Sequence, residues 1–124
     1  MKDTRPVNLD IATIKLPITA YASILHRISG VFLFIAIGIM IYALDLSLSS
    51  AEGFAWVVSA LDSLVAKLVV WAVLSGLIYH SVAGVKHLIM DMGYGETYEG
   101  GVLGSRITFL VSAVMIALAG FWVW

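Results

Sequence analysis

The chain has 124 residues, of which 61% are hydrophobic and 12% charged, with a formal net charge of −1 and no cysteine. A soluble domain has about 45–50% apolar and about 25% charged residues, and a domain near 150 residues buries only about 68–70% of its surface. The composition therefore excludes a soluble monomer and a disordered chain, and the balanced charge excludes a basic nucleic-acid surface. Without cysteine, the chain holds no disulfide and no iron–sulfur cluster of its own.

The first 20 residues are polar, carry charges of both signs, and include the helix breakers Pro6 and Pro17. These features predict an extended cytoplasmic N-terminal arm over residues 1–20. The remaining residues, 21–124, are predicted to form one membrane domain.

Three segments without Asp, Glu, Lys or Arg follow the arm, at residues 28–44, 68–85 and 107–124. A helix needs about 17–25 mostly apolar residues to cross the hydrocarbon core, and each segment reaches this length with its flanking residues. Backbone amides in lipid must be satisfied within their own segment, so each segment should be helical. The sequence predicts an all-α membrane protein with three transmembrane helices, over about 21–45, 63–92 and 104–124.

Local signals mark the ends of these helices. Residues 49–52 (SSAE) have the form of a capping box, which predicts a short surface helix between the first two spans. Asp62 is placed to cap the second span, and Gly93 and Gly95 are placed to end it.

All but one of the seven Lys and Arg residues lie in the arm, at the start of the first span, or in the second loop. The exception is Lys67, which lies with the first loop. Positive charge favours the cytoplasmic side, so we predict a cytoplasmic N-terminus and a periplasmic C-terminus. The four tryptophans fall at or near the predicted outer surface, where an aromatic belt is expected.

Polar residues of the first span share one helical stripe near its cytoplasmic end. Ser23, His26, Arg27 and Gly30 are spaced i, i+3, i+4 and i+7. Intramembrane polar groups are costly and commonly functional. A hydroxyl, an imidazole and a guanidinium together can hold a carbonyl oxygen that becomes an anion on reduction, which outlines a quinone head-group site. An arginine near a helix end also often extends to lipid phosphate and does nothing more.

The second span carries His80, Gly84, His87 and Asp91 on one stripe, at i, i+4, i+7 and i+11. His80 is the deeper histidine, and Gly76 and Gly84 lie one turn to either side of it. A flat surface around an imidazole suits a haem, because the ring must approach the helix for a nitrogen to reach the iron. The same spacing also serves close helix packing, with the histidine hydrogen-bonded across the interface.

The second axial ligand of such a haem cannot come from the same helix as His80. His87 is about 10.5 Å away along the axis, whereas trans axial nitrogens lie only about 4 Å apart. The other ligand must come from His26 or from another chain. Because His26 lies nearer the membrane surface than His80, we favour another chain.

Two motifs resemble those of a known family. Residues 23–30 (SILHRISG) resemble the S-x-x-H-R-x-[ST]-G motif of the cytochrome b556 membrane-anchor subunits of bacterial succinate dehydrogenases. Residues 80–91 (HSVAGVKHLIMD) resemble the second motif of this family, H-x-x-x-G-x-[RK]-H-x-x-x-D, and residues 5–10 (RPVNLD) resemble its N-terminal start. The match covers nearly the whole chain. Lys86 stands where arginine is commoner, and lysine lacks the bidentate guanidinium.

The resemblance implies a membrane anchor of succinate dehydrogenase (respiratory complex II) in the bacterial inner membrane. It implies three partners: a second small anchor subunit, an iron–sulfur subunit and a flavoprotein subunit, with FAD and the iron–sulfur clusters in the latter two. Succinate oxidation, a step of the tricarboxylic acid cycle, belongs to the flavoprotein. This chain alone would therefore hold no catalytic residue, and would help to pass electrons to ubiquinone.

By motif position, the resemblance implies His80 as one axial ligand of a haem b that is shared with the second anchor subunit. His87 is implied as a further haem contact. Gly76 and Gly84 would allow the haem to approach closely.

The resemblance further implies Ser23 and Arg27 as ubiquinone-site residues, with His26 and Arg27 on the side of the haem propionates. Two other functions stay open. One is an anchor subunit of a fumarate reductase-type quinol oxidoreductase, which runs in the reverse direction. The other is a non-redox scaffold whose glycines and histidines serve only helix packing.

Overall fold

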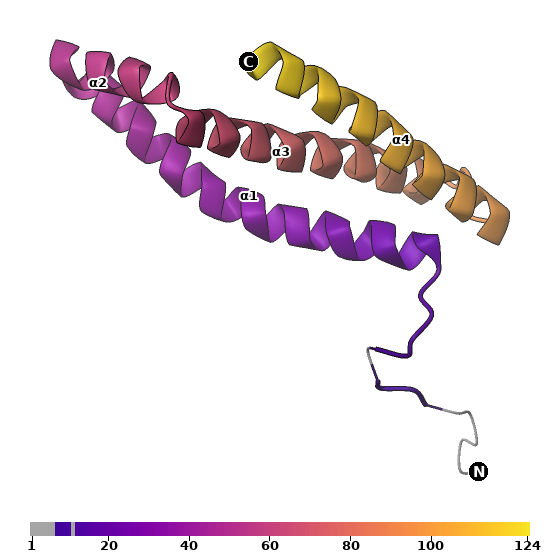
Figure 1. Cartoon of the computed structure of the whole chain (residues 1–124). Helices are drawn as coiled ribbons and strands as arrows, with labels where there is room; N and C mark the ends of the chain where they lie inside the picture. Colours follow the sequence, from indigo (N-terminus) through magenta and orange to yellow (C-terminus); the bar gives the residue numbers. More distant parts are fainter. Residues whose placement is uncertain (1–6, 11) are drawn as a thin grey trace.

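The computed structural model describes residues 7–10 and 12–124, which form four α-helices and, among these residues, no β-strand (Figure 1). The helices in chain order are α1 (Ile18–Ser49), α2 (Ala51–Leu61), α3 (Leu64–Asp91) and α4 (Tyr98–Val123). The all-α prediction is confirmed. Arg5 and Pro6, which open the N-terminal motif, lie outside the described residues.

Helices α1, α3 and α4 are each long and apolar enough to cross a membrane, which confirms the three predicted spans. Helix α1 is longer than the predicted 21–45. It begins at Ile18, directly after its N-cap Pro17, so the predicted extended arm ends three residues earlier than 20. Its last turns continue past the apolar segment and pack against α2. Leu44 and Ser47 of α1 line a common hollow with Val57 and Leu61 of α2. The C-terminal end of α1 therefore forms a helical hairpin with α2.

Helix α2 confirms the surface helix that the capping signal predicts, but its register differs by one residue. Ser50, not Ser49, is the N-cap, and its hydroxyl accepts a hydrogen bond of 3.0 Å from the Gly53 amide. Glu52 lies in the first turn, where its negative charge interacts favourably with the positive end of the helix dipole.

The start of α3 corrects the predicted role of Asp62. Asp62 is the C-cap of α2, and Ser63 caps α3 by accepting a hydrogen bond of 3.2 Å from the Ala66 amide. At the other end, Gly93 has φ +88°, and the Tyr94 amide donates to the Ile89 carbonyl at 3.2 Å. This is the geometry of a Schellman motif, so the glycine signal for the end of α3 is confirmed.

Helix α4 begins six residues before the predicted 104, at Tyr98. The Thr97 hydroxyl caps it by accepting from the Gly100 amide at 3.1 Å. The glycines of the first turns pack closely on the rest of the bundle, since a Cβ on the buried Gly101 would lie 3.5 Å from Cγ2 of Thr19. A segment whose composition suggests a loop is thus helical because of its cap and its packing.

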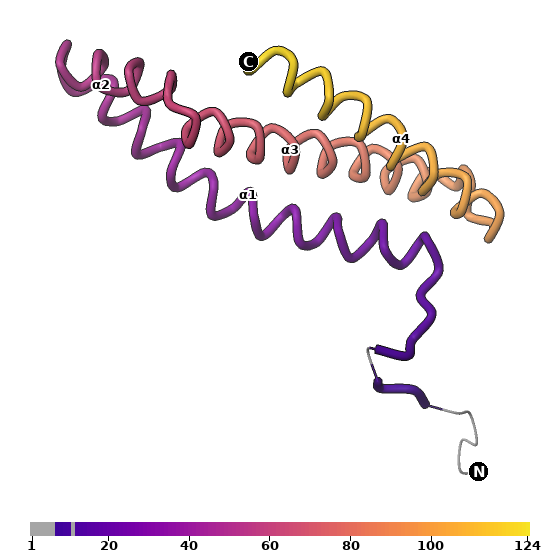
Figure 2. The backbone as a smooth tube through the Cα atoms, in the orientation of Figure 1, coloured from indigo at the N-terminus to yellow at the C-terminus, as the bar shows by residue number. Residues whose placement is uncertain are grey.

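The three long helices lie side by side, and each runs antiparallel to the next one along the chain (Figure 2). The N-terminal end of α1 therefore lies at the same end of the bundle as the connection from α3 to α4 (Figure 2). This arrangement brings together the two polar stripes of the sequence. At the opposite end, the rings of Trp71 and Trp124 meet edge to face, with centroids 6.1 Å apart.

Small residues mediate the packing of α4 on α3 and α1. The buried residues of α4 recur every three or four positions and are all small or hydroxyl-bearing: Gly101, Ser105, Thr108 and Ser112. Such residues let membrane helices approach closely. Most large apolar side chains of the described residues remain exposed, so the bundle presents an apolar surface to lipid and to other membrane helices.

Candidate functional site

Three histidines from two helices form one cluster near the end of the bundle where α3 connects to α4. The ring of His26 from α1 stacks on that of His80 from α3, with centroids 4.2 Å apart and planes 21° apart. The ring of His87, two turns further along α3, lies 5.2 Å from that of His26 and is tilted by 40°. The histidine cluster (His26, His80 and His87) therefore unites both sequence motifs.

Two acceptors on α1 hold the His80 ring. Its Nδ1 lies 2.9 Å from the Ser29 hydroxyl and 3.1 Å from the His26 carbonyl oxygen. The Ser29 hydroxyl donates its own proton to the same carbonyl, at 2.7 Å. We infer that Nδ1 of His80 carries the proton and donates, which in a neutral ring leaves the lone pair on Nε2.

Glycines determine how closely the two helices approach. A Cβ on Gly30 would lie 3.1 Å from Cε1 of His80, so this glycine lets the ring lie against α1. A Cβ on Gly84 would lie 3.7 Å from Nε2 of His26, and one on Gly76 would lie 2.8 Å from Cδ1 of Phe32. The neighbours of Gly76 and Gly84 are thus side chains of α1. Their predicted role beside a haem stays a prediction.

The Nε2 atom of His26 is buried, and none of the described residues provides a hydrogen-bond partner for it. A buried polar atom without a partner is unfavourable by about 1–3 kcal/mol, so its retention requires an explanation. A carboxylate or another acceptor brought by a ligand would satisfy this nitrogen.

Arg27 lines a hollow of α1 that includes none of the three histidines. Its side chain is exposed and lines this shallow hollow of about 430 Å³ together with Ile28, Val31, Phe32 and Ile35. Ser23 is half-buried and lies one turn before Arg27 on the same stripe. The structure therefore keeps Ser23 and Arg27 near the end of the bundle, with Arg27 open to a ligand or a partner.

Two residues of this region were not among the predicted site residues. Ser29, the [ST] position of the first motif, contacts His80. Its position three residues after His26, which puts it on the same helix face, was the available signal. The Tyr79 hydroxyl donates to the Ala22 carbonyl at 2.8 Å and ties α3 to α1, and no sequence pattern indicated it.

The donors of the cluster suit a haem better than a bare metal ion. Within the described residues, no group of three or more His, Asp or Glu side chains is arranged to hold an ion. A haem iron needs only one nitrogen from this chain, and a ligating histidine characteristically donates its other N–H to a carbonyl. His80 has this second hydrogen bond, so the residues present fit the group.

Comparison with known proteins gives consistent results. Residues 1–120 match the family described as succinate dehydrogenase/fumarate reductase transmembrane subunit. The chain is 41% identical to the succinate dehydrogenase cytochrome b556 subunit of Coxiella burnetii, over 100% of both chains. It is 32% identical to the cytochrome b556 subunit of Paracoccus denitrificans (94% of this chain, 90% of the relative) and 32% identical to the cytochrome b560 subunit of Marchantia polymorpha (83% and 82%).

Proposed function

Since the chain belongs to the succinate dehydrogenase/fumarate reductase transmembrane subunit family, we propose that it anchors succinate dehydrogenase in the membrane, binds part of a haem b and forms part of the ubiquinone-reduction site. The relatives carry the name of succinate dehydrogenase, which favours succinate oxidation over the fumarate reductase direction. The chain is one subunit of an oxidoreductase, and the flavin chemistry belongs to a partner.

Within this proposal, His80 would hold the haem iron through its Nε2 atom. When bound, haem b supplies a one-electron redox centre. Ser29 and the His26 carbonyl fix the tautomer and the orientation of the His80 ring, so that Nε2 has its lone pair available. His87, about 10.5 Å from His80 along α3, is too far away to hold the same iron, so a residue of the second anchor subunit would complete the haem site.

The propionates of the haem would lie on the side of His26 and Arg27. Nε2 of His26, which has no partner within the described part of the chain, can donate to a carboxylate, and the Arg27 guanidinium can neutralise the charge of that carboxylate. His87 stacks near His26 and is proposed as a further contact on this side.

Ser23 and Arg27 would bind the quinone head group. Reduction develops negative charge on a quinone oxygen, which the permanent charge of Arg27 stabilises. The Ser23 hydroxyl can donate a hydrogen bond to the same oxygen. The excess of Lys and Arg at this end of the bundle indicates that it faces the cytoplasm. Protons for the reduced quinone would therefore have a short path from the cytoplasm.

The partners and the membrane follow from the same reasoning. The exposed apolar surface of the three spans fits a second small anchor subunit as well as lipid. An iron–sulfur subunit would dock on the cytoplasmic side and carry the flavoprotein subunit. The named relatives include bacterial proteins, which supports the bacterial inner membrane as the location.

The observation that carries the proposal is the pair of hydrogen bonds that hold Nδ1 of His80 against α1. The test is a visible spectrum of the dithionite-reduced protein, purified from its membrane together with the subunits that copurify. The expected result is a b-type absorption band with flavin and iron–sulfur subunits present. Colourless protein with its partners bound would contradict the haem and favour a scaffold.

A further inference from the structure

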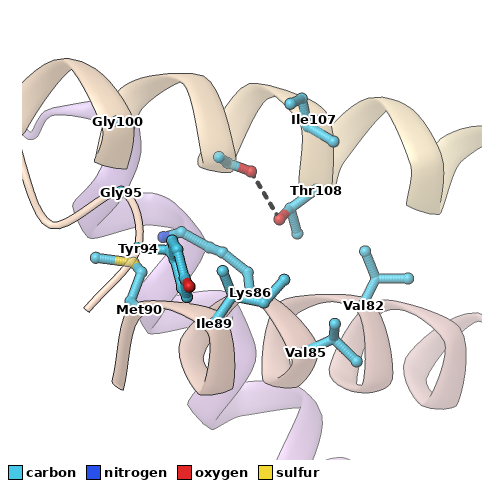
Figure 3. A pocket seen from close by; sticks show the side chains of 11 residues that line it. Val82, Val85, Lys86, Ile89, Met90, Tyr94, Gly95, Gly100, Ile107 and Thr108 are labelled. Atoms are coloured by element: carbon cyan, nitrogen blue, oxygen red, sulfur yellow. Dashed lines mark hydrogen bonds between the residues drawn. The ribbon is translucent and has the colours of Figure 1, made fainter. Parts of the chain in front are cut away.

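A groove of about 310 Å³ lies between α3 and α4, at the end of the bundle where the two helices are connected (Figure 3). Val82 and Val85 of α3 and Ile107 of α4 form part of its apolar wall, and Tyr94 and Gly95 of the connection lie at one end. The groove shares no lining residue with the histidine cluster. It therefore requires an explanation of its own.

Lys86 supplies the charge of this groove. Its aliphatic stem lies along α4, since a Cβ on Gly104 would be 3.4 Å from Cε and 3.6 Å from Cγ of the lysine. Figure 3 shows the side chain extending toward the end of the groove where Tyr94 and Gly95 lie. The absence of a side chain at Gly104 allows this course.

The ammonium group of Lys86 donates to the Ser105 hydroxyl at 3.2 Å. That hydroxyl is buried and donates in turn to the Gly101 carbonyl at 2.8 Å. A hydroxyl carries no negative charge, so this hydrogen bond holds the lysine in place without neutralising it. Two further protons of the ammonium group remain to bind an anion.

Lys86, the one charged side chain among the described residues that line the groove, lies toward one end of it along the helix axis. Lys86 and the connection lie toward the end of the bundle, whereas Val82 lies one turn, or about 6 Å, deeper along α3. A charged group at the headgroup level followed by an apolar channel toward the hydrocarbon matches the two parts of a phospholipid. Basic pockets between transmembrane helices characteristically bind lipid headgroups.

We propose that this groove binds one phospholipid, with its phosphate on the Lys86 ammonium group and one acyl chain over Val82, Val85 and Ile107. The size supports a lipid over a partner helix. A helix is about 10–12 Å across with its side chains, whereas the groove has the volume of a small-ligand site. The phosphate recognises the lysine by charge, and the chain covers the apolar wall.

The test uses the complex as purified, depleted of lipid and then supplied with a dioleoyl phosphatidylglycerol that carries a diazirine on one acyl chain. After illumination, mass spectrometry maps the labelled residues. Label is expected on Val82, Val85 or Ile107. A dioleoylglycerol with the same diazirine has the same chains but no phosphate, and should label the groove about tenfold less.

Substitutions at two lysines of α3 complete the test. Lys86→Gln should reduce labelling of the groove about tenfold, and Lys86→Arg, which keeps the charge, should preserve it. Lys67→Gln, the same substitution near the other end of α3, should leave the labelling unchanged.

Equal labelling by the phospholipid and by the diacylglycerol would overturn the proposal, and this comparison needs no variant. Equal labelling of Lys86→Gln and the unaltered chain would also overturn it. So would a groove that stays unlabelled while labels collect elsewhere on the protein, because a partner subunit would then cover it.

Discussion

The two faces of helix α3 differ in how they use polar groups. On the face toward α1, His80 is held by two acceptors from the other helix, and Nε2 of His26 lies buried with no partner among the described residues. On the face toward α4, Trp71 donates to the Ile116 carbonyl, and Thr108 donates to a carbonyl of its own helix. Ser112 is the exception on this face, because its buried hydroxyl has no hydrogen-bond partner among the residues that the structure describes.

This difference separates packing from function. Between α3 and α4, the hydroxyls of Ser105 and Thr108 donate to carbonyls of their own helix, and small residues let the two helices pack closely. The α1 face retains Nε2 of His26, a buried nitrogen without a partner among the described residues, which is unfavourable unless something binds there. Substitutions on the two faces should therefore have different effects.

The largest expected effect comes from His80→Ala, which removes the proposed iron ligand from the α1 face. The b-type band in the reduced-minus-oxidised spectrum of the purified complex should disappear. His87→Ala, on the same helix, should retain the band. An unchanged spectrum in His80→Ala would eliminate His80 as a ligand. The α1 face would then, like the α4 face, serve only helix packing.

Arg27→Leu should lower the rate of quinone reduction about 10²–10³-fold, because a charge that stabilises the developing anion is lost. The haem content, measured by the same spectrum, should be largely retained. Equal losses of haem and turnover would instead indicate that Arg27 serves assembly.

Gly76→Ala tests the packing of α1 on α3. The new methyl group would lie 2.8 Å from Phe32, so we expect a loss of stability of about 1–3 kcal/mol, measured as a lower thermal midpoint of the complex. Gly38→Ala is the matched control, because no heavy atom outside its own helix turn lies within 4 Å of a Cβ there. Similar midpoints for the two variants would contradict the close approach.

The smallest effect is expected for Ser29→Ala, which removes one of the two acceptors of His80. A weaker Nδ1 hydrogen bond makes the ligand less basic and favours the ferrous state. The haem midpoint potential should rise by at most about 60 mV, as measured by redox titration. Thr108→Val, which removes a hydroxyl from the α4 face, should leave the potential unchanged.

Much of the fold could be predicted because it depends on composition and on the length of the apolar segments. Apolar length predicted the three spans, and the glycines after Asp91 predicted the end of α3. The early start of α4 at Tyr98 could not be predicted, because it depends on the Thr97 cap and on contacts with α1. Local composition carries no information about such tertiary contacts.

The site could also be predicted only in part. Helical spacing placed His26 and His80 on polar stripes of separate helices, and the structure stacks their rings. The rotation of α1 about its axis decides which side chain meets His80, and a single sequence does not contain it. For this reason Ser29, and not Ser23, is the hydroxyl that contacts the ring.

The most direct test of the central claim is an electron cryomicroscopy structure of the whole complex that resolves side chains. The expected map shows a porphyrin iron bonded to Nε2 of His80, with Nδ1 within hydrogen-bond distance of Ser29 and of the His26 carbonyl. A porphyrin held by His26 or His87 instead, or the absence of any porphyrin beside α3, would contradict the account.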